Sequence, residues 1–122
     1  MFRWLIGTIA LSMMATGALA ADPVEIHIGY LGHAGVKSTL SLVEQPADND
    51  GIAGARLAIE DNNTTGKFLN QRFTLDEVKV KDSDDVARVA TDLAGRNDYI
   101  ITDLPADALL KVADALRDRG TV

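Results

Sequence analysis

The sequence predicts an α/β protein with a three-layer αβα arrangement around an open parallel sheet of strand order 2-1-3. Three short segments rich in β-forming residues alternate with segments of helical periodicity, which is typical of parallel strands joined by right-handed crossovers. The second of these strands carries the most charges, so we place it at the edge and the first strand at the centre. Thr121 and Val122 resemble the start of a fourth strand, which indicates the front of a longer protein.

The three strands are short and end in or near turn-forming residues. The first is expected over residues 25–31 (EIHIGYL), where Gly32 ends it, and the third over residues 98–104 (DYIITDL). The second is expected over residues 72–80 (RFTLDEVKV). Its apolar alternation slips between Leu75 and Val78, so we expect this edge strand to carry a β-bulge.

The first two helices have clear apolar stripes. The first helix is expected over residues 51–62, with Ile52, Ala55 and Ile59 on one side. The second is expected over residues 83–94, because a serine followed by two acidic residues favours a helix N-terminus, and the glycine at position 95 can end it. Four residues form its apolar stripe: Val86, Val89, Ala90 and Leu93.

The third helix has both a start and a stop signal. Pro105 suits its first turn, and two arginines followed by Gly120 suit its end. Its apolar residues recur at helical spacing: Leu109, Val112, Ala113 and Leu116.

Residues 1–20 (MFRWLIGTIALSMMATGALA) have the composition of an export signal. Arg3 supplies the positive start, and the apolar run is short for a bilayer core of roughly 30 Å. Ala18-Leu19-Ala20 fits the small-x-small pattern of a signal peptidase site, so we expect cleavage before Ala21 and a periplasmic mature chain of residues 21–122. The alternative is an N-terminal membrane anchor that is not cleaved.

Composition excludes several classes of function. The net charge of −6 becomes −7 when Arg3 leaves with the signal, and no basic cluster appears, which disfavours nucleic acid and anionic lipid as partners. The chain has no cysteine, so disulfides, thiolate nucleophiles and thiolate metal sites are excluded. About a hundred residues after the signal suffice for one small domain.

The segment 32–39 (GHAGVKST) resembles a phosphate-binding loop without matching one. That motif requires lysine directly after its second glycine, but Val36 separates Gly35 from Lys37, and Tyr30 stands where the first glycine is required. The glycines also miss the G-x-G-x-x-G spacing of dinucleotide sites. We therefore interpret the segment as a turn that lets backbone approach a small ligand.

Four pieces in order resemble the opening of periplasmic binding proteins of the leucine/isoleucine/valine group, the soluble receptors of ABC importers. They are an I-x-I-G strand (residues 26–29), a G-x-x-x-A-x-E-x-N helix (residues 54–62), a glycine-containing turn (residues 64–66) and an acidic cluster (residues 81–85). The segment 55–66 (ARLAIEDNNTTG) is most similar to a branch of this family encoded beside PQQ-dependent alcohol oxidation systems. The resemblance implies the partial N-terminal lobe of a type I binding protein and an ABC permease as partner.

One departure from this family concerns its ligand. Amino-acid-binding members carry a serine-rich turn after the third strand that holds the ligand carboxylate, whereas this sequence has Asp103-Leu104-Pro105-Ala106-Asp107. Two carboxylates would repel an α-carboxylate brought there. We therefore expect a small polar ligand, neutral or hydroxyl-bearing, rather than a free branched-chain amino acid.

The candidate ligand-binding residues are His33, Asp103 and Ala106, because ligands of open α/β sheets lie beyond the carboxyl ends of the strands. His33 follows the first strand and can donate or accept a proton; the alternative is a solvated loop histidine. Asp103 can accept a hydrogen bond from a ligand; the alternative is capping of the third helix. We expect Asp107 to stabilise the first turn of that helix rather than to contact a ligand.

No metal or cofactor site is expected. The acids at positions 82, 84 and 85 lack the spacing of a calcium loop, so helix capping explains them better, and His27 lies apart from His33. The residues also suggest no nucleophile–base pair, so we do not expect an enzyme.

The expected function is therefore the extracytoplasmic solute-binding component of an ABC importer, which captures a ligand between two lobes and delivers it to a permease. The alternatives are a ligand-sensing domain of a receptor and an exported enzyme on a doubly wound sheet.

Overall fold

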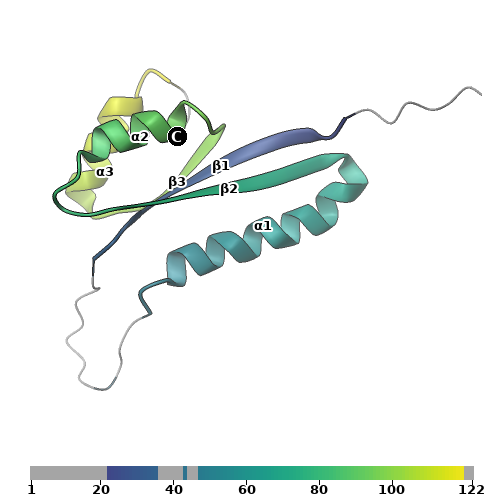
Figure 1. Cartoon of the computed structure of the whole chain (residues 1–122), viewed down its shortest axis with the longest axis horizontal. Coiled ribbons are helices and arrows are strands. Elements are labelled where there is room, and N and C mark those ends of the chain that lie inside the picture. Colours follow the sequence, from purple (N-terminus) through teal and green to yellow (C-terminus); the bar gives the residue numbers. More distant parts are fainter. Residues whose placement is uncertain (1–21, 36–42, 44–46, 120–122) are drawn as a thin grey trace, which may run out of the picture.

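The computed structural model describes residues 22–35, 43 and 47–119, and in this part of the chain three strands alternate with three helices (Figure 1). The expectations for residues 1–20, 36–39 and 120–122 lie outside the described residues. The elements are β1 (Val24–His33), α1 (Asp50–Leu69), β2 (Gln71–Val80), α2 (Val86–Ala94), β3 (Tyr99–Asp103) and α3 (Ala106–Leu116). Both strand pairs are parallel and the order is β2-β1-β3, which confirms the predicted topology.

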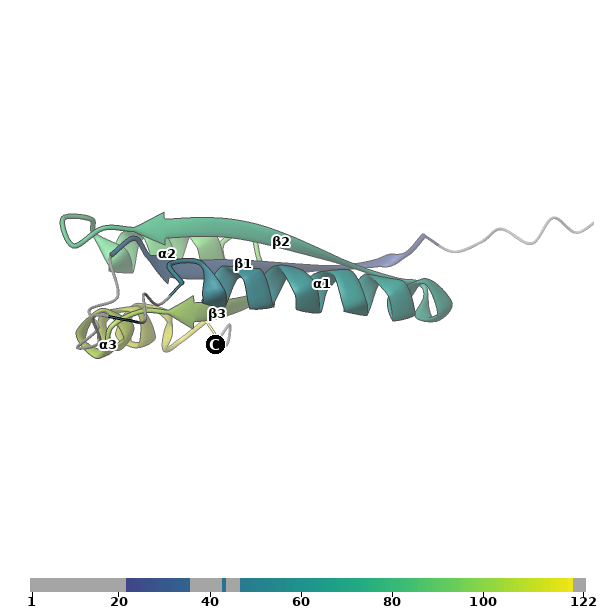
Figure 2. The same cartoon turned by 90° about the horizontal axis from the view of Figure 1, so that it is seen from below.

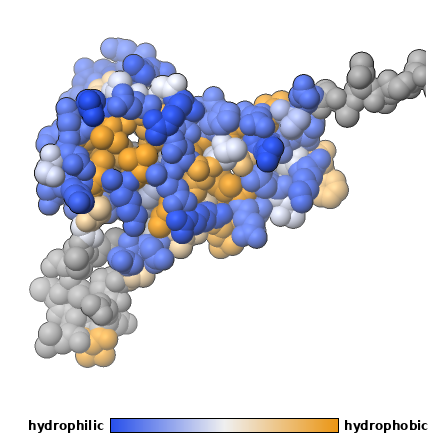
Figure 3. All heavy atoms as spheres, viewed as in Figure 1, coloured by the Kyte–Doolittle hydropathy of each residue, from blue (hydrophilic) through white to orange (hydrophobic). Residues whose placement is uncertain are grey.

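The helices divide between the two faces of the sheet. α1 covers one face, and α2 and α3 together cover the other (Figure 1), while Figure 2 shows the three strands side by side. Neighbouring residues of a strand point to opposite faces, so Tyr30 joins a small core with Ile52 and Ala55 of α1, and Leu31 joins the larger core beneath α2 and α3. Figure 3 shows two separate hydrophobic areas among hydrophilic residues, one of them at the end that carries α2 and α3.

The expected bulge in β2 is wrong. β2 pairs with β1 in unbroken register from Val24↔Gln71 to His33↔Val80. Leu75 packs on the core beneath α1, whereas Val78 packs on the core beneath α2 and α3. The apparent slip in the apolar pattern is thus a change of the buried face along a regular strand, which needs no inserted residue.

α1 is longer than expected and runs through residues 64–66, so the predicted turn there is wrong. The chain turns instead at Asn70, whose left-handed backbone (φ 53°) lets its N–H reach the carbonyl of Gly66. Gly66 is buried, and a Cβ at this position would lie 2.7 Å from the carbonyl oxygen of Gln71. Its glycine serves the close approach of the helix to β2 rather than a break in the helix.

α2 begins later than expected. Asp85, not Ser83, is the N-cap, and its carboxylate accepts the N–H of Arg88 at 3.1 Å. A carboxylate is the better cap here, because it adds negative charge beside the helix N-terminus. Gly95 follows the helix with ordinary right-handed dihedrals (φ −72°). The predicted stripe is correct, with Val89 only partly buried.

α3 begins at Ala106 with Pro105 as its N-cap residue, one position earlier than we expected for proline. Val112 and Leu116 are buried as predicted, but Leu109 and Ala113 are exposed. α3 packs chiefly against α2, so it buries a narrower stripe than a helix lying across strands would. Arg117 is the C-cap residue, and the two arginines lie beyond the last helical residue.

Candidate functional site

This topology directs attention to the carboxyl ends of β1 and β3 as the place where a ligand would lie. The connection after β1 leads through α1 to β2 on one side, whereas β3 lies on the other side of β1. Neighbouring strands whose connections diverge in this way leave a crevice beyond their carboxyl ends. The sheet therefore presents His33, the last residue of β1, and Asp103, the last residue of β3, at the same edge.

A pocket of about 360 Å³ opens at this edge. Its lining comes from β1, β2, β3 and the segments that follow β1 and β3: Tyr30, His33, Gly35, Asp48, Lys79, Asp103, Leu104 and Pro105. Its volume is within the range of small-molecule sites. The pocket brings His33 and Asp103 together, although they are far apart in the sequence.

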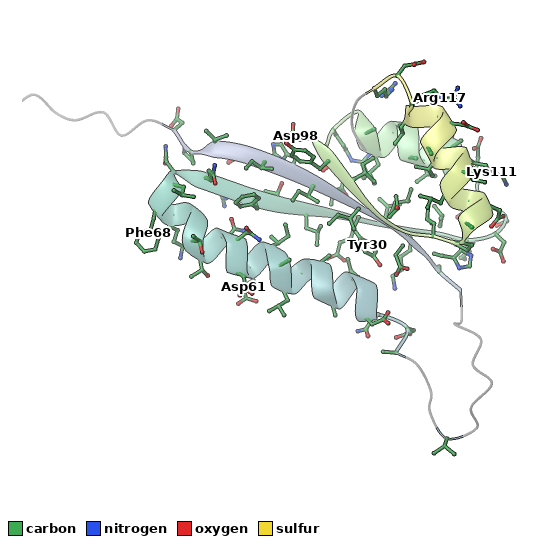
Figure 4. All side chains as sticks on the ribbon, turned by 180° about the vertical axis from the view of Figure 1, so that it is seen from behind. Tyr30, Asp61, Phe68, Asp98, Lys111 and Arg117 are labelled. Atoms are coloured by element: carbon green, nitrogen blue, oxygen red, sulfur yellow. The ribbon has the colours of Figure 1, made fainter. Side chains whose placement is uncertain are left out.

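Tyr30 and Asp103 are joined across the two strands. The Tyr30 hydroxyl donates to Oδ2 of Asp103 at 2.9 Å, and the Tyr30 side chain, labelled in Figure 4, is almost completely buried. Burial, reinforced by the Asp103 carboxylate, raises the pKa of Tyr30 to about 12. The phenol therefore stays protonated and holds Asp103 in place as a hydrogen-bond acceptor.

The start of α1 packs against this pair. A Cβ at Gly51 would lie 2.6 Å from the Tyr30 hydroxyl oxygen and would also clash with Oδ2 of Asp103. Only glycine lets the first turn of α1 approach so closely. The N-terminus of α1, where the Gly51 N–H donates to Asp50 Oδ1 at 2.9 Å, is thereby brought beside Tyr30 and Asp103 of the pocket.

His33 forms a wall of the pocket and is held from the opposite side. Its Nε2 lies 2.8 Å from Oδ1 of Asp82, in the turn after β2. The side chain is 24% exposed, so His33 belongs to the end of a strand and is not the fully solvated loop residue of the alternative interpretation. It separates the pocket from a smaller hollow of about 70 Å³ toward α3.

The pocket offers both hydrogen-bond acceptors and donors. Asp48 and Asp103 supply carboxylates, and Lys79 supplies an ammonium group from β2. Leu104 and Pro105 add apolar surface. This mixture suits a small polar molecule that both donates and accepts hydrogen bonds.

Of the predicted site residues, His33 and Asp103 meet at the pocket. Ala106 lies next to it as the exposed first residue of α3, and its neighbour Pro105 contributes the lining. The expected alternative for Asp103, capping of α3, is wrong, because no side chain caps this helix and Asp103 accepts from Tyr30 instead. Asp107 does lie in the first turn of α3.

Sequence reasoning missed Tyr30, Lys79, Asp48 and Gly51. Tyr30 shares a face of β1 with Ile28 by simple alternation, which identifies its side of the sheet but not its partner on β3. Lys79 and Asp48 come from segments whose distance from the pocket depends on the packing of α1 and β2. No local signal in the sequence identifies them.

Asp84 and His27, which the sequence analysis also considered as metal ligands, have structural partners. Asp84 accepts the N–H of Lys81 at 2.8 Å, and His27 Nδ1 lies 2.8 Å from the Thr74 hydroxyl. Among the described residues, no three His, Asp or Glu side chains are grouped so that they could hold a metal ion. No described helix combines the length and the apolar character needed to cross a bilayer.

Comparison with known proteins identified no matching family model, no similar curated protein and no similar solved structure.

Proposed function

We propose that this chain is the front part of an exported solute-binding protein of an ABC importer. The observation that carries the proposal is the pocket between the carboxyl ends of β1 and β3, where side chains from separate strands converge. This is where open α/β sheets bind small ligands. In the proposed receptor a second lobe closes over this edge and the closed form docks on a membrane permease.

The pocket favours a small hydroxyl-bearing ligand. The Asp103 carboxylate, oriented by Tyr30, can accept a ligand O–H, and Lys79 and His33 can contact its oxygen atoms. Pro105 has no N–H, so the start of α3 offers an anion one donor fewer, although the N–H of Ala106 remains near the same edge. Two carboxylates disfavour the α-carboxylate of an amino acid.

A titration followed by ¹⁵N–¹H NMR tests the site. We would add ethanol, 1,2-propanediol and glycerol to the full chain in separate titrations. Leucine, isoleucine and valine, which carry an α-carboxylate, would be titrated for comparison. We expect weak binding, on the order of millimolar, with shifts concentrated at Tyr30, His33, Asp103 and Ala106, because a second lobe supplies part of the contacts.

Matched variants make this titration specific. Asp103→Ala and His33→Ala should reduce the shifts, whereas Glu60→Ala, an exposed change in α1, should not. Micromolar binding of leucine, isoleucine or valine that survives both pocket variants would overturn the proposed specificity and the site.

The gene context tests the proposed role. The DNA downstream of codon 122 should encode a second lobe, with permease genes nearby. A transmembrane helix followed by a signalling domain would instead identify a receptor sensor.

A further inference from the structure

Asp50 and Gly51 form a pair that occurs once in the sequence. No other aspartate and no asparagine of the chain is followed by glycine. The backbone nitrogen of the following residue can attack the side-chain carboxyl group of an aspartate, and a side chain on that following residue obstructs the attack. Glycine has no Cβ and offers no such obstruction. The pair at positions 50 and 51 is therefore the place in this sequence most open to that reaction.

The structure places the two reacting groups side by side. The Gly51 N–H donates to Oδ1 of Asp50 at 2.9 Å, so the carboxyl group already lies beside the nitrogen that would attack it. Such proximity within one molecule supplies much of what a reaction between two groups requires. Asp50 is also exposed, so solvent water can reach its carboxyl group.

The Gly51 nitrogen is not held by a hydrogen bond of the helix. Asp50 is the first residue of α1, and the first N–H groups of a helix have no partner within it. At this end of α1 the N–H of Ala53 donates to the carbonyl of Asn49 at 2.8 Å, two residues beyond Gly51. The Gly51 nitrogen can therefore approach the carboxyl carbon without breaking a bond of the helical ladder.

We propose that Asp50 of the folded chain is converted to isoaspartate through a cyclic succinimide formed with Gly51. In the first step the Gly51 nitrogen attacks Cγ of Asp50, the N–Cγ bond forms, and the carboxyl hydroxyl leaves with the amide hydrogen as one water molecule. In the second step a water molecule opens the ring. Cleavage of the N–Cγ bond restores aspartate, whereas cleavage of the bond to the main-chain carbonyl carbon of Asp50 gives isoaspartate. No electrons are transferred, and solvent water is the only co-reactant.

The product would disturb the packing of α1 on the sheet. Isoaspartate routes the main chain through Cβ and Cγ of Asp50, which adds one carbon to the path between Asp50 and Gly51. Gly51 has little room for such a change, because even a Cβ there would lie 2.6 Å from the Tyr30 hydroxyl oxygen and would clash with Asp103. Conversion should therefore displace the first turn of α1 from these two residues. The reaction requires no ligand and goes beyond the proposed function, so either proposal can fail alone.

Incubation of the full chain in ¹⁸O-labelled water at neutral pH tests the reaction. Each opening of the ring leaves one heavy oxygen in the product, and digestion in ordinary water followed by mass spectrometry locates it. Isoaspartate itself is identified by chromatographic separation from the aspartate peptide and by enzymatic methylation with an isoaspartyl methyltransferase. A peptide of residues 47–54 is the unfolded reference. We expect the folded chain to convert at a rate within about tenfold of the peptide, because the reacting groups are already adjacent.

Two controls make this measurement specific. Asp50→Glu should give no isomer, because the ring would need one more carbon, and circular dichroism verifies that this variant folds. Asp107 is an internal control, because it also lies in the first turn of a helix but is followed by Ala108, which has a Cβ. A folded chain without isoaspartate at Asp50 when the peptide has reached half conversion, or equal conversion at Asp107, would overturn the proposal.

Urea denaturation of aged samples tests the structural consequence. The aged wild-type chain should unfold at a lower urea concentration than the fresh chain, because the first turn of α1 no longer packs closely at Gly51. Aged Asp50→Glu should keep the midpoint of its fresh sample. A converted wild-type chain with an unchanged midpoint would overturn the expected loss of packing.

Discussion

Tyr30, Asp103 and Gly51 act as one unit at the carboxyl edge of the sheet. Each comes from a different element, and each restricts the other two: the phenol donates to the carboxylate, and the absence of a side chain at position 51 leaves room for both. Such a unit fixes the direction of a carboxylate at the mouth of the pocket. The proposed ligand site depends on this arrangement of three residues.

Gly51→Ala should lower the free energy of unfolding by about 1–2 kcal/mol, because its Cβ displaces the buried Tyr30 hydroxyl and disturbs its hydrogen bond. The matched control is Gly54→Ala in the same helix, where a Cβ meets nothing within 4 Å. That change should raise stability by up to about 1 kcal/mol through helix propensity. Urea denaturation measures both, and equal effects of the two changes would contradict the close packing at Gly51.

Tyr30 should make stability depend on alkaline pH. Its pKa is raised from 10.0 to about 12 in the folded chain, so between these values the unfolded state loses the phenolic proton first. The folded state then binds more protons, and stability falls as the pH rises from 10 toward 12.

Urea denaturation at several pH values measures this decrease, and Tyr30→Phe should flatten it. Tyr99→Phe is the control, because Tyr99 is exposed and is the second of the two tyrosines of the chain. The same slope in the wild-type chain and in Tyr30→Phe would show that the phenol is not the cause.

Single contacts between elements set how the helices lie on the sheet. Arg56 of α1 donates to both carboxylate oxygens of Glu77 on β2, at 2.7 and 2.6 Å, and this hydrogen bonding lowers the pKa of Glu77. The Asn63 side chain of α1 also bonds to β2: its amide donates to the Phe73 carbonyl and its oxygen accepts the Phe73 N–H, each at 2.8 Å. These contacts hold α1 along β2. The start of α1 is thereby positioned so that Gly51 reaches the pocket.

Asp85→Ala should cost about 1 kcal/mol of stability, because the N-cap of α2 loses its acceptor for the Arg88 N–H. Ser83→Ala should cost only a few tenths, because Ser83 lies before the cap and is exposed. Thermal denaturation of the two variants compares them. A larger loss for Ser83→Ala would restore the serine as the capping residue.

In the described part of the chain, helices cover the two faces of the three-stranded sheet unequally. The larger core lies beneath α2 and α3, and the smaller one lies beneath α1 and is built on Tyr30. The pocket and the exposed side chains of Tyr99 and Ile101 lie where the described cover ends.

Export of the whole chain should release a protein that begins at Ala21. The reason is the short apolar segment followed by Ala18-Leu19-Ala20 in the sequence. N-terminal sequencing of periplasmic material measures this directly. Material that begins at Met1 and stays with the membrane would show an anchor instead.

The sequence by itself determined the order of elements, the parallel sheet and the place of the charged strand at its edge. These follow from local patterns: helical spacing in α2, short β-rich runs in β1 and β3, and the charges of β2. It also brought His33 and Asp103 into one candidate site, because the carboxyl ends of parallel strands share an edge. Two local signals were misleading. Gly66 does not end α1, because its glycine is needed where the helix approaches the Gln71 backbone. Ser83 does not cap α2, because the Asp85 carboxylate accepts the Arg88 N–H instead.

Only the tertiary structure decided which residues complete the site and which helix residues cover the outer side of β2. Tyr30 meets Asp103 through the pairing of β1 with β3, and Lys79 reaches the pocket through the pairing of β1 with β2. Asn63 bonds to the backbone groups of Phe73 on β2 only because α1 continues past residue 62 and lies along that strand. These relations join residues far apart in the sequence, and their distances depend on how whole elements pack, which no local pattern encodes.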